Sequence, residues 1–203
     1  MIKGNVTLCG TICHAATLRP NKQDEIYTNF SVKVGLPIGV GNTKDCWVSV
    51  RKKGGTPEEL EQYLVCTPVE ITGKLNFRKN KEDIYLNLMA DMIEISDETK
   101  PEGIKGEIEF YGKVGTVPEI KNDKYGNKYM YFSGYSSEVS GDERVFIWVR
   151  FIRFSGEKED FLEKGNGIHV TGTLDMLFYN DRLSLGCRFK EVERWVKDKT
   201  ETK

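Results

Sequence analysis

The sequence predicts an all-β protein made of two five-stranded barrels in tandem, each with one short helix between its third and fourth strands. Two observations support this fold class: segments in which apolar and polar residues alternate, and an internal repeat with a period of about half the chain. A chain of 203 residues has room for two such domains. Its composition, 38% hydrophobic and 30% charged residues, is that of a folded globular chain.

Five short segments of the first half recur in the second half in the same order. For example, Gly10 of "LCGTI" matches Gly112 of "FYGKV", and Trp47 of "DCWVSVR" matches Trp148 of "FIWVRFIR". A nearly constant offset between matched residues is hard to obtain by chance, so we expect two homologous domains. The expected parts are a first domain at 1–97, a polar linker at 98–103, a second domain at 104–197 and a tail at 198–203.

Both halves contain the alternation that is typical of half-buried strands. In "VEITGKLNF", Val69, Ile71 and Leu75 alternate with polar or charged residues, and "IHVTGTL" repeats the pattern in the second half. Gly73 and Gly172 stand at the same inward position of these two strands. Glycine in mid-strand usually marks a bend or a bulge, as at the corner of a small barrel.

Each half also has room for one helix between its third and fourth strands. In "TPEELEQYL", Thr56 suits the N-cap, Pro57 the first helical position and Glu59 the capping box. The equivalent segment "SGEKEDFLEKG" runs from Ser155 to Gly165. Five strands with a helix between the third and the fourth, in ~95 residues, are the pattern of the OB-fold.

The third strand of each half has one face for the core and one for solvent. Val48 and Val50 suit a barrel core, so the other face of "DCWVSVRKK" turns outward. Arg153 fits this pattern poorly because it falls on the core side of its strand; either the barrel opens there or the face assignment changes. The outward residues are then Trp47, Arg51 and Lys53 and, by the repeat, Trp148, Arg150 and Phe154.

Further candidates for the outward surface each have a structural alternative. Tyr131 and Tyr135 share a face opposite Phe132 and either extend the surface or cover one end of the barrel. The hairpin "NFRKNKEDIY" is either a basic finger or a solvated turn. The first half is more basic and the second more aromatic, so we expect unequal contributions. The hairpin candidates are Arg78 and Lys79 in the first half, and Phe178 and Tyr179 in the second.

The second half resembles the bacterial single-stranded-DNA-binding proteins over nearly all of residues 109–193. The resemblance rests on the Gly-x-x-Gly-x-x-Pro run of "FYGKVGTVPEI" and on "FIWVRFIRFSGEKEDFLEKGNGIHVTGTL". The first half is recognised mainly through the repeat, so the whole chain is similar to the tandem-OB variant of this family. The resemblance implies stacking roles for Trp148, Phe154 and the region of Phe178 and Tyr179. It also implies four OB domains per assembly, and therefore a homodimer.

One feature departs from the family. The chain ends in "KDKTETK" rather than in an acidic, phenylalanine-tipped peptide, so we expect no recruitment of partners through such a tip.

These features predict sequence-independent binding of single-stranded DNA in replication, recombination or repair. Unpaired bases stack on exposed aromatic rings, while arginine and lysine contact the phosphates. The alternative is an OB-fold module for protein interaction or assembly that binds no nucleic acid. Exposed Trp47 and Trp148 beside Arg51 and Arg150 would favour DNA, whereas buried tryptophans would favour the alternative.

Other classes of function find little support in the sequence. No catalytic motif surrounds His14 or His169, so we expect a non-enzymatic protein without a cofactor. The five cysteines include no CxxC pair, which predicts reduced thiols in the cytoplasm and no metal site. No apolar run approaches the ~18 residues of a membrane span, and we expect no secretory signal. The net charge of −1 provides no overall basic field, so binding would depend on local patches.

Overall fold

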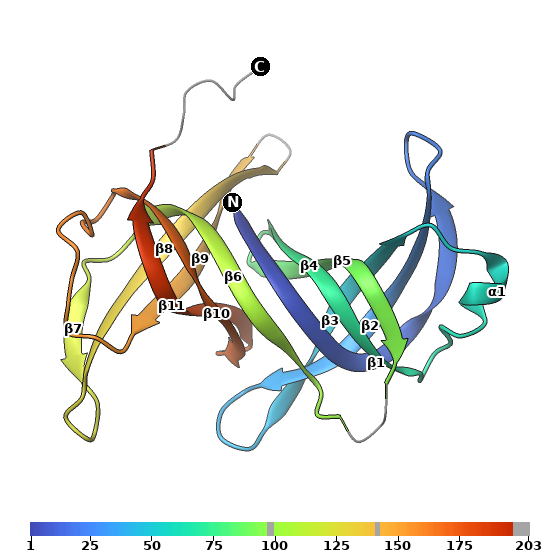
Figure 1. The fold of residues 1–203 in the computed structure, drawn as a ribbon, viewed down its shortest axis with the longest axis horizontal. Coiled ribbons are helices and arrows are strands. Elements are labelled where there is room, and N and C mark those ends of the chain that lie inside the picture. The colour runs from blue at the N-terminus through green and yellow to red at the C-terminus, as the bar shows by residue number, and fades with distance from the viewer. Residues whose placement is uncertain (97–99, 141–142, 197–203) are drawn as a thin grey trace. The chain divides into compact units, whose positions relative to one another are not determined.

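The alternating segments of the sequence form β-strands in a computed structural model that describes residues 1–96, 100–140 and 143–196 (Figure 1). The first half contains β1 (Ile2–Pro20), β2 (Ile26–Pro37), β3 (Thr43–Lys53), α1 (Pro57–Leu60), β4 (Pro68–Asn80) and β5 (Asp83–Ile95). The second half contains β6 (Gly103–Val114), β7 (Glu119–Asn122), β8 (Lys128–Ser140), β9 (Glu143–Arg153), β10 (Gly167–Tyr179) and β11 (Arg182–Arg194).

The strands of the first half form a closed barrel. Their order is β2-β3-β5-β4-β1, and β1 pairs back with β2 to close the barrel. The β3–β5 pair is parallel, whereas β1–β2, β1–β4, β2–β3 and β4–β5 are antiparallel. This is the five-stranded arrangement of the OB-fold, as the sequence predicts.

The strands of the second half follow the same plan. Their order is β6-β10-β11-β9-β8-β7, β6 also pairs with β8, and β9–β11 is the parallel pair. The short strand β7 is an addition to the predicted five, and it forms an antiparallel hairpin with β8. The all-β fold of two OB barrels in tandem is therefore confirmed.

The chain folds into two compact units. The N-terminal unit comprises Lys3–Gly106 and Met176–Leu183, and the C-terminal unit comprises Met1–Ile2, Glu107–Asp175 and the described part of Ser184–Lys203. The predicted domain boundaries, 1–97 and 104–197, stay a prediction. Residues 97–99, which include part of the predicted linker, and the predicted tail 198–203 lie outside the described residues.

Each barrel has its own apolar core. In the N-terminal unit, Leu8, Val48 and Ile71 are fully buried, and Phe30 stacks on Tyr63 with 5.5 Å between ring centroids. The core of the C-terminal unit is more aromatic, because ring pairs join its largest buried side chains. Phe151 meets Phe110 edge-on at 5.0 Å, stacks on Phe132 at 4.9 Å and meets Phe189 at 6.3 Å.

The two mid-strand glycines lie where another backbone approaches closely. A Cβ at Gly73 would lie 2.2 Å from the carbonyl oxygen of Met89, and a Cβ at Gly172 would lie 2.4 Å from that of Arg188. The β4–β5 register shifts beside Gly73, because Thr72 pairs with Met92 and Gly73 with Ala90. The extra residue, Asp91, belongs to β5, so the bulge lies opposite the glycine rather than in its own strand. Both positions therefore exclude a side chain.

The predicted helix of the first half is present but short. The side chain of Thr56 caps it by accepting a hydrogen bond from the backbone N–H of Glu59 at 3.3 Å, and Pro57 occupies the first turn. The helix ends at Leu60, and Tyr63 then turns into the core. Among the described residues no helix is long and apolar enough to cross a membrane.

The prediction of a helix in the second half is wrong, because residues 155–166, all of which are described, form turns and irregular backbone instead. The hydroxyl oxygen of Ser155 accepts a hydrogen bond from the backbone N–H of Glu157 at 3.1 Å. The guanidinium of Arg153 donates to the carbonyl oxygen of Glu157 at 2.7 Å. The bond from Arg153 occupies the carbonyl of Glu157, which in a helix would accept from the N–H four residues later. The bond to Ser155 is of the kind that an N-cap makes and does not itself oppose a helix.

The contacts of Arg153 explain why an arginine stands on the core side of its strand. It ends β9, and its guanidinium binds the carboxylate of Glu159 (Nη2–Oε2 3.0 Å) while lying 5.0 Å from the ring centroid of Phe189. The face assignment of β9 therefore holds to its last residue, where the arginine caps the core rather than entering it.

Candidate nucleic-acid interface

The third strand of each barrel exposes its tryptophan, as the sequence predicts. On β3, Val48 and Val50 point into the core while Trp47 is 60% exposed. On β9, Val149 is fully buried while Trp148 is 49% exposed. An exposed tryptophan is unusual because this residue type is highly buried on average, so two at matched positions make this face the candidate binding surface.

In the C-terminal unit, Trp148 belongs to a cluster of rings. Tyr135 pairs with it across β8 and β9, with 5.1 Å between centroids, and Phe146 meets Tyr135 edge-on at 5.5 Å. The indole lies against the backbone of Gly115, where a Cβ would be only 2.3 Å from Cζ3 of the ring. The tryptophan is thus held against the barrel on one side and open to solvent on the other.

The rings continue along β8 and β9. Tyr131 pairs with Ile152, and Tyr129 lies 6.5 Å from Phe154, which is 70% exposed just after the end of β9. Arg150 lies half-buried between the two ends of this series. We call the series the aromatic strip; its members are Tyr129, Tyr131, Tyr135, Phe146, Trp148 and Phe154.

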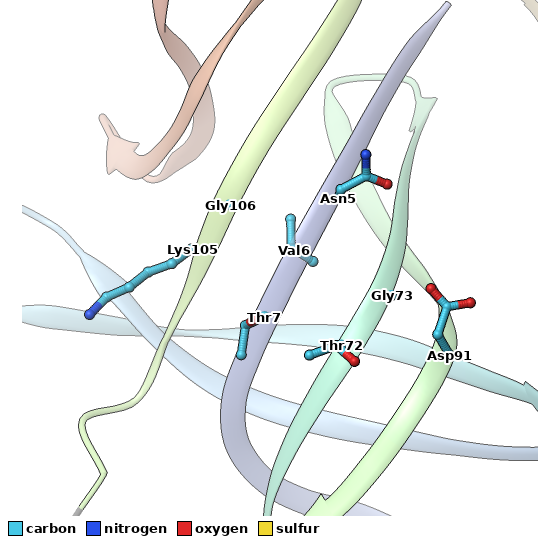
Figure 2. Close-up of a pocket in the computed structure, with 8 residues that line it drawn as sticks. All are labelled: Asn5, Val6, Thr7, Thr72, Gly73, Asp91, Lys105 and Gly106. Carbon is cyan, nitrogen blue, oxygen red and sulfur yellow. The ribbon is translucent and has the colours of Figure 1, made fainter.

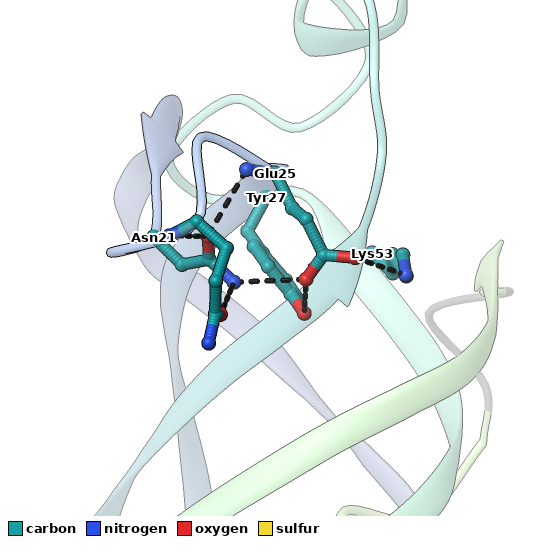
Figure 3. A network of polar contacts seen from close by, with 5 residues as sticks. Asn21, Glu25, Tyr27 and Lys53 are labelled. Atoms are coloured by element: carbon teal, nitrogen blue, oxygen red, sulfur yellow. Dashed lines mark hydrogen bonds and ion pairs between the residues drawn. The ribbon is translucent and has the colours of Figure 1, made fainter.

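In the N-terminal unit, charged groups surround the matching strand. The guanidinium of Arg51 lies 3.7 Å from the ring centroid of Tyr27, a close cation–π contact. The ammonium of Lys53 binds the carboxylate of Glu25 at 2.6 Å. Figure 3 shows how Asn21 donates to the same carboxylate, at 2.9 Å, from the turn that precedes it.

These contacts change the acidity of the pair. The hydrogen bond from Lys53, and then that from Asn21, holds the pKa of Glu25 below its usual range. The same carboxylate raises the pKa of Lys53. The charge of Lys53 is therefore already balanced within the protein, and a phosphate that approaches it must compete with Glu25.

The four hairpin residues that the sequence suggested do not form one surface. Arg78 is exposed on the outward face of β4, but Lys79 follows it on the opposite face. Tyr179 is exposed, whereas Phe178 is half-buried with the ammonium of Lys44 4.9 Å from its ring centroid. Of these residues, the outward positions of Arg78 and Tyr179 suit contact with a ligand best.

The N-terminal unit also has an open pocket of about 340 Å³ beside the bulge of β5 (Figure 2). Asp91 and Lys105 extend to opposite sides of it in this view. None of the predicted site residues lines the pocket, so we do not place the interface there. Its lining residues are Asn5, Val6, Thr7, Thr72, Gly73, Asp91, Lys105 and Gly106.

His169 has structural contacts on the outside of its barrel. Its ring stacks on Tyr111 at 4.2 Å, and its Nε2 lies 3.2 Å from Oε1 of Glu109. Nδ1 lies 3.5 Å from Oε2 of Glu193. Within the described parts of the chain, histidine, cysteine and carboxylate side chains form no group of three that could hold a metal ion.

Together these observations define the chain as two OB barrels in tandem, each with an exposed tryptophan on its third strand. The wild-type single-stranded DNA binding protein from Thermus aquaticus is similar in structure, with a TM-score of 0.50 and 17% identity over 98% of this chain and 96% of that chain. A deletion mutant of the same protein has a TM-score of 0.46 and 16% identity, over 98% of each chain. The Plasmodium falciparum single-stranded DNA-binding protein in complex with single-stranded DNA has a TM-score of 0.33 and 23% identity, over 44% of this chain and 94% of that chain.

At these identities the similarity bears on the fold. The wild-type Thermus match spans both barrels of this chain, in agreement with the tandem architecture. No protein-family model and no curated protein matches the sequence.

Proposed function

We propose that this protein binds single-stranded DNA without strong sequence preference, through aromatic stacking and phosphate contacts on the outer faces of its OB barrels. The observation that carries this proposal is the exposure of Trp47 and Trp148 at matched positions of two barrels. Rings that are open on one face can stack on unpaired bases, whereas a duplex hides its bases from them. The single-stranded DNA-binding proteins with which the chain shares its fold support the same ligand.

The proposed contacts differ between the barrels. In the C-terminal unit, the aromatic strip offers successive rings along β8 and β9, with Arg150 among them for a phosphate. In the N-terminal unit, Trp47 offers a ring, and Arg51, Lys53 and Arg78 offer positive charge. We propose that Tyr179 adds a ring at the tip of the β10–β11 hairpin, where it is exposed. Lys79 and Phe178 remain weaker candidates.

An interaction module without nucleic-acid binding would account less well for these faces. Both tryptophans are exposed, and the basic side chains that lie on the same strands suit a ligand that carries phosphates. We further propose a non-enzymatic role in replication, recombination or repair in the cytoplasm, with a homodimer that presents four OB domains.

The test is a titration that follows tryptophan fluorescence, with an oligo-dT strand and with a duplex of equal length, each at two salt concentrations. We expect the single strand to quench emission, the duplex to bind more weakly, and the affinity to fall as salt rises because phosphate contacts release counterions. Absence of quenching, or equal binding of the duplex, would overturn the proposal.

A variant with both Trp47→Ala and Trp148→Ala then tests the assigned site, with binding followed by the anisotropy of a labelled oligonucleotide. Loss of one stacked base at each position costs ~1–3 kcal/mol. Trp195, which packs against Tyr111 at 5.7 Å, remains as a reporter of folding. A folded double variant that binds like the wild type would show that the site lies elsewhere.

A further inference from the structure

Beside Trp47, a second exposed ring lies on the outer face of the N-terminal barrel. Val48 of β3 pairs with Leu86 of β5 in the parallel register, and both point into the core. The residues that precede them, Trp47 and Tyr85, therefore stand next to each other on the outward face. Tyr85 is 52% exposed, and its side chain contributes little to the core.

The pairing on either side extends this arrangement into a row across four strands. Lys33 of β2 pairs with Trp47, and Arg78 of β4 pairs with Tyr85. Two rings thus lie between two cations. Within the described residues Lys33 binds Asp45 at 3.2 Å, whereas no ion pair engages Arg78. We call these four residues, Lys33, Trp47, Tyr85 and Arg78, the cross-strand row.

The row has the chemistry that a single strand requires. Neighbouring β-strands are ~4.8 Å apart, so Trp47 and Tyr85 are close enough to stack on neighbouring bases of one DNA strand. The free guanidinium of Arg78, beside the tyrosine, is placed for a phosphate of the same nucleotide. The adjacent row on the same outer face, two residues along each β-strand, consists of Ser49, Asn87 and Asn76. These are small polar side chains that leave the rings accessible.

We propose that Tyr85 is a second base-stacking residue of the N-terminal unit and forms a two-ring platform with Trp47 for unpaired nucleobases. This inference rests on the proposed function and adds a residue that the sequence did not suggest. It also gives the N-terminal face a second ring beside the basic residues that the sequence indicated there.

The C-terminal unit supports the proposal by contrast. There the ring beside Trp148 is Tyr135, on β8. On the other side of Trp148, Leu185 of β11 pairs with Val149, so the position equivalent to Tyr85 is held by Ser184, which has no ring. Each barrel thus gives its exposed tryptophan one aromatic neighbour, but on opposite sides of the strand. The shared feature is an aromatic neighbour of the tryptophan on an adjacent β-strand, even though the repeat does not conserve the position of that neighbour.

The proposal is tested with Tyr85→Ala in the full chain, with labelled oligo-dT as the ligand. We expect an affinity about tenfold lower than that of the wild type, since one stacked base is lost. Tyr85→Phe keeps the ring and should bind like the wild type. Tyr125→Ala removes an exposed tyrosine from the turn between β7 and β8, outside the cross-strand row, and is the matched control.

A second measurement identifies the contact directly. Photocrosslinking to an oligonucleotide that carries 5-iododeoxyuridine should label peptides that contain Tyr85 as well as those that contain Trp47. If the wild type binds the strand but Tyr85→Ala binds equally well and no crosslink reaches Tyr85, the platform is refuted while the proposed function stands. If the wild type binds no single strand at all, the proposed function itself fails.

Discussion

The close packing of Trp148 on Gly115 leads to a prediction about a single methyl group. In Gly115→Ala, the new Cβ would lie 2.3 Å from Cζ3 and 2.9 Å from Cη2 of the indole. Carbon atoms in contact are ordinarily ~3.5–4.0 Å apart, so the ring must move outward by more than an ångström. The ring can do so because half of it already faces solvent.

The expected cost falls on binding rather than on stability. Overpacking in a closed core costs ~1–3 kcal/mol, but here the main clash is with a ring that can move into solvent, while the carbonyl oxygen of Ser133, 3.1 Å from the new Cβ, has to yield only slightly. Replacing glycine by alanine also restricts the unfolded chain, which stabilises the folded protein by ~0.4–1 kcal/mol. The free energy of unfolding should therefore change by less than ~1 kcal/mol. Displacing the indole from Tyr135 should remove most of one stacking contact, which corresponds to about tenfold in affinity.

Three measurements on the same sample decide the matter: the urea midpoint, the emission maximum of the tryptophans, and the affinity for oligo-dT. Gly156→Ala is the control, since the atom nearest to its Cβ would be Cδ of the flexible Lys128 side chain, at 3.0 Å. A Gly115→Ala protein with unchanged emission and unchanged affinity would show that the glycine does not position the tryptophan.

The remaining predictions concern stability, charge and thiol reactivity. Gly172→Ala should destabilise the protein by about 3 kcal/mol, seen as a lower urea midpoint, because its Cβ meets backbone that cannot yield; an unchanged midpoint would contradict this. Glu25→Gln should release Lys53 from its ion pair, so the variant should bind oligo-dT more tightly and its affinity should depend more steeply on salt. In the wild type, the same release should occur as the pH falls through the lowered pKa of Glu25. Equal salt slopes for the variant and the wild type would refute this role of Glu25. Burial raises the pKa of Cys187 to about 12, so iodoacetamide at pH 8 should modify exposed Cys66 well before Cys187, and mass spectrometry showing equal rates would count against the buried site.

Most of the fold could be predicted because its evidence is local and repeated. Alternation placed Val48 and Val50 inward and Trp47 outward, and the repeat transferred this assignment to Trp148. The helix of the second half was mispredicted for an equally local reason. Arg153 donates a hydrogen bond to the carbonyl oxygen of Glu157, and this bond depends on where β9 ends and not on helix propensity.

The site could be predicted only in part, because pairing between distant strands is not visible in a sequence. Tyr85 becomes a neighbour of Trp47 through the parallel register of β3 and β5, and no pattern within "EDIYLNL" indicates that register. The pairing of Lys53 with Glu25 likewise depends on the turn that precedes β2. Residue type could suggest the ligand, but the neighbours of each ring required the structure.

The parallel pairing within each barrel also has a consequence for how the chain reaches its native state. β3 cannot pair with β5 until α1 and β4 have been synthesised and placed, so barrel closure depends on contacts between residues far apart in sequence. Folds dominated by such contacts form in milliseconds to seconds rather than microseconds. During that interval one backbone edge of β3 and one of β9 lack their partner strands, and these unpaired N–H and C=O groups can associate with other chains. Slower synthesis at low temperature should therefore raise the yield of folded protein, since closure would have more time to precede aggregation.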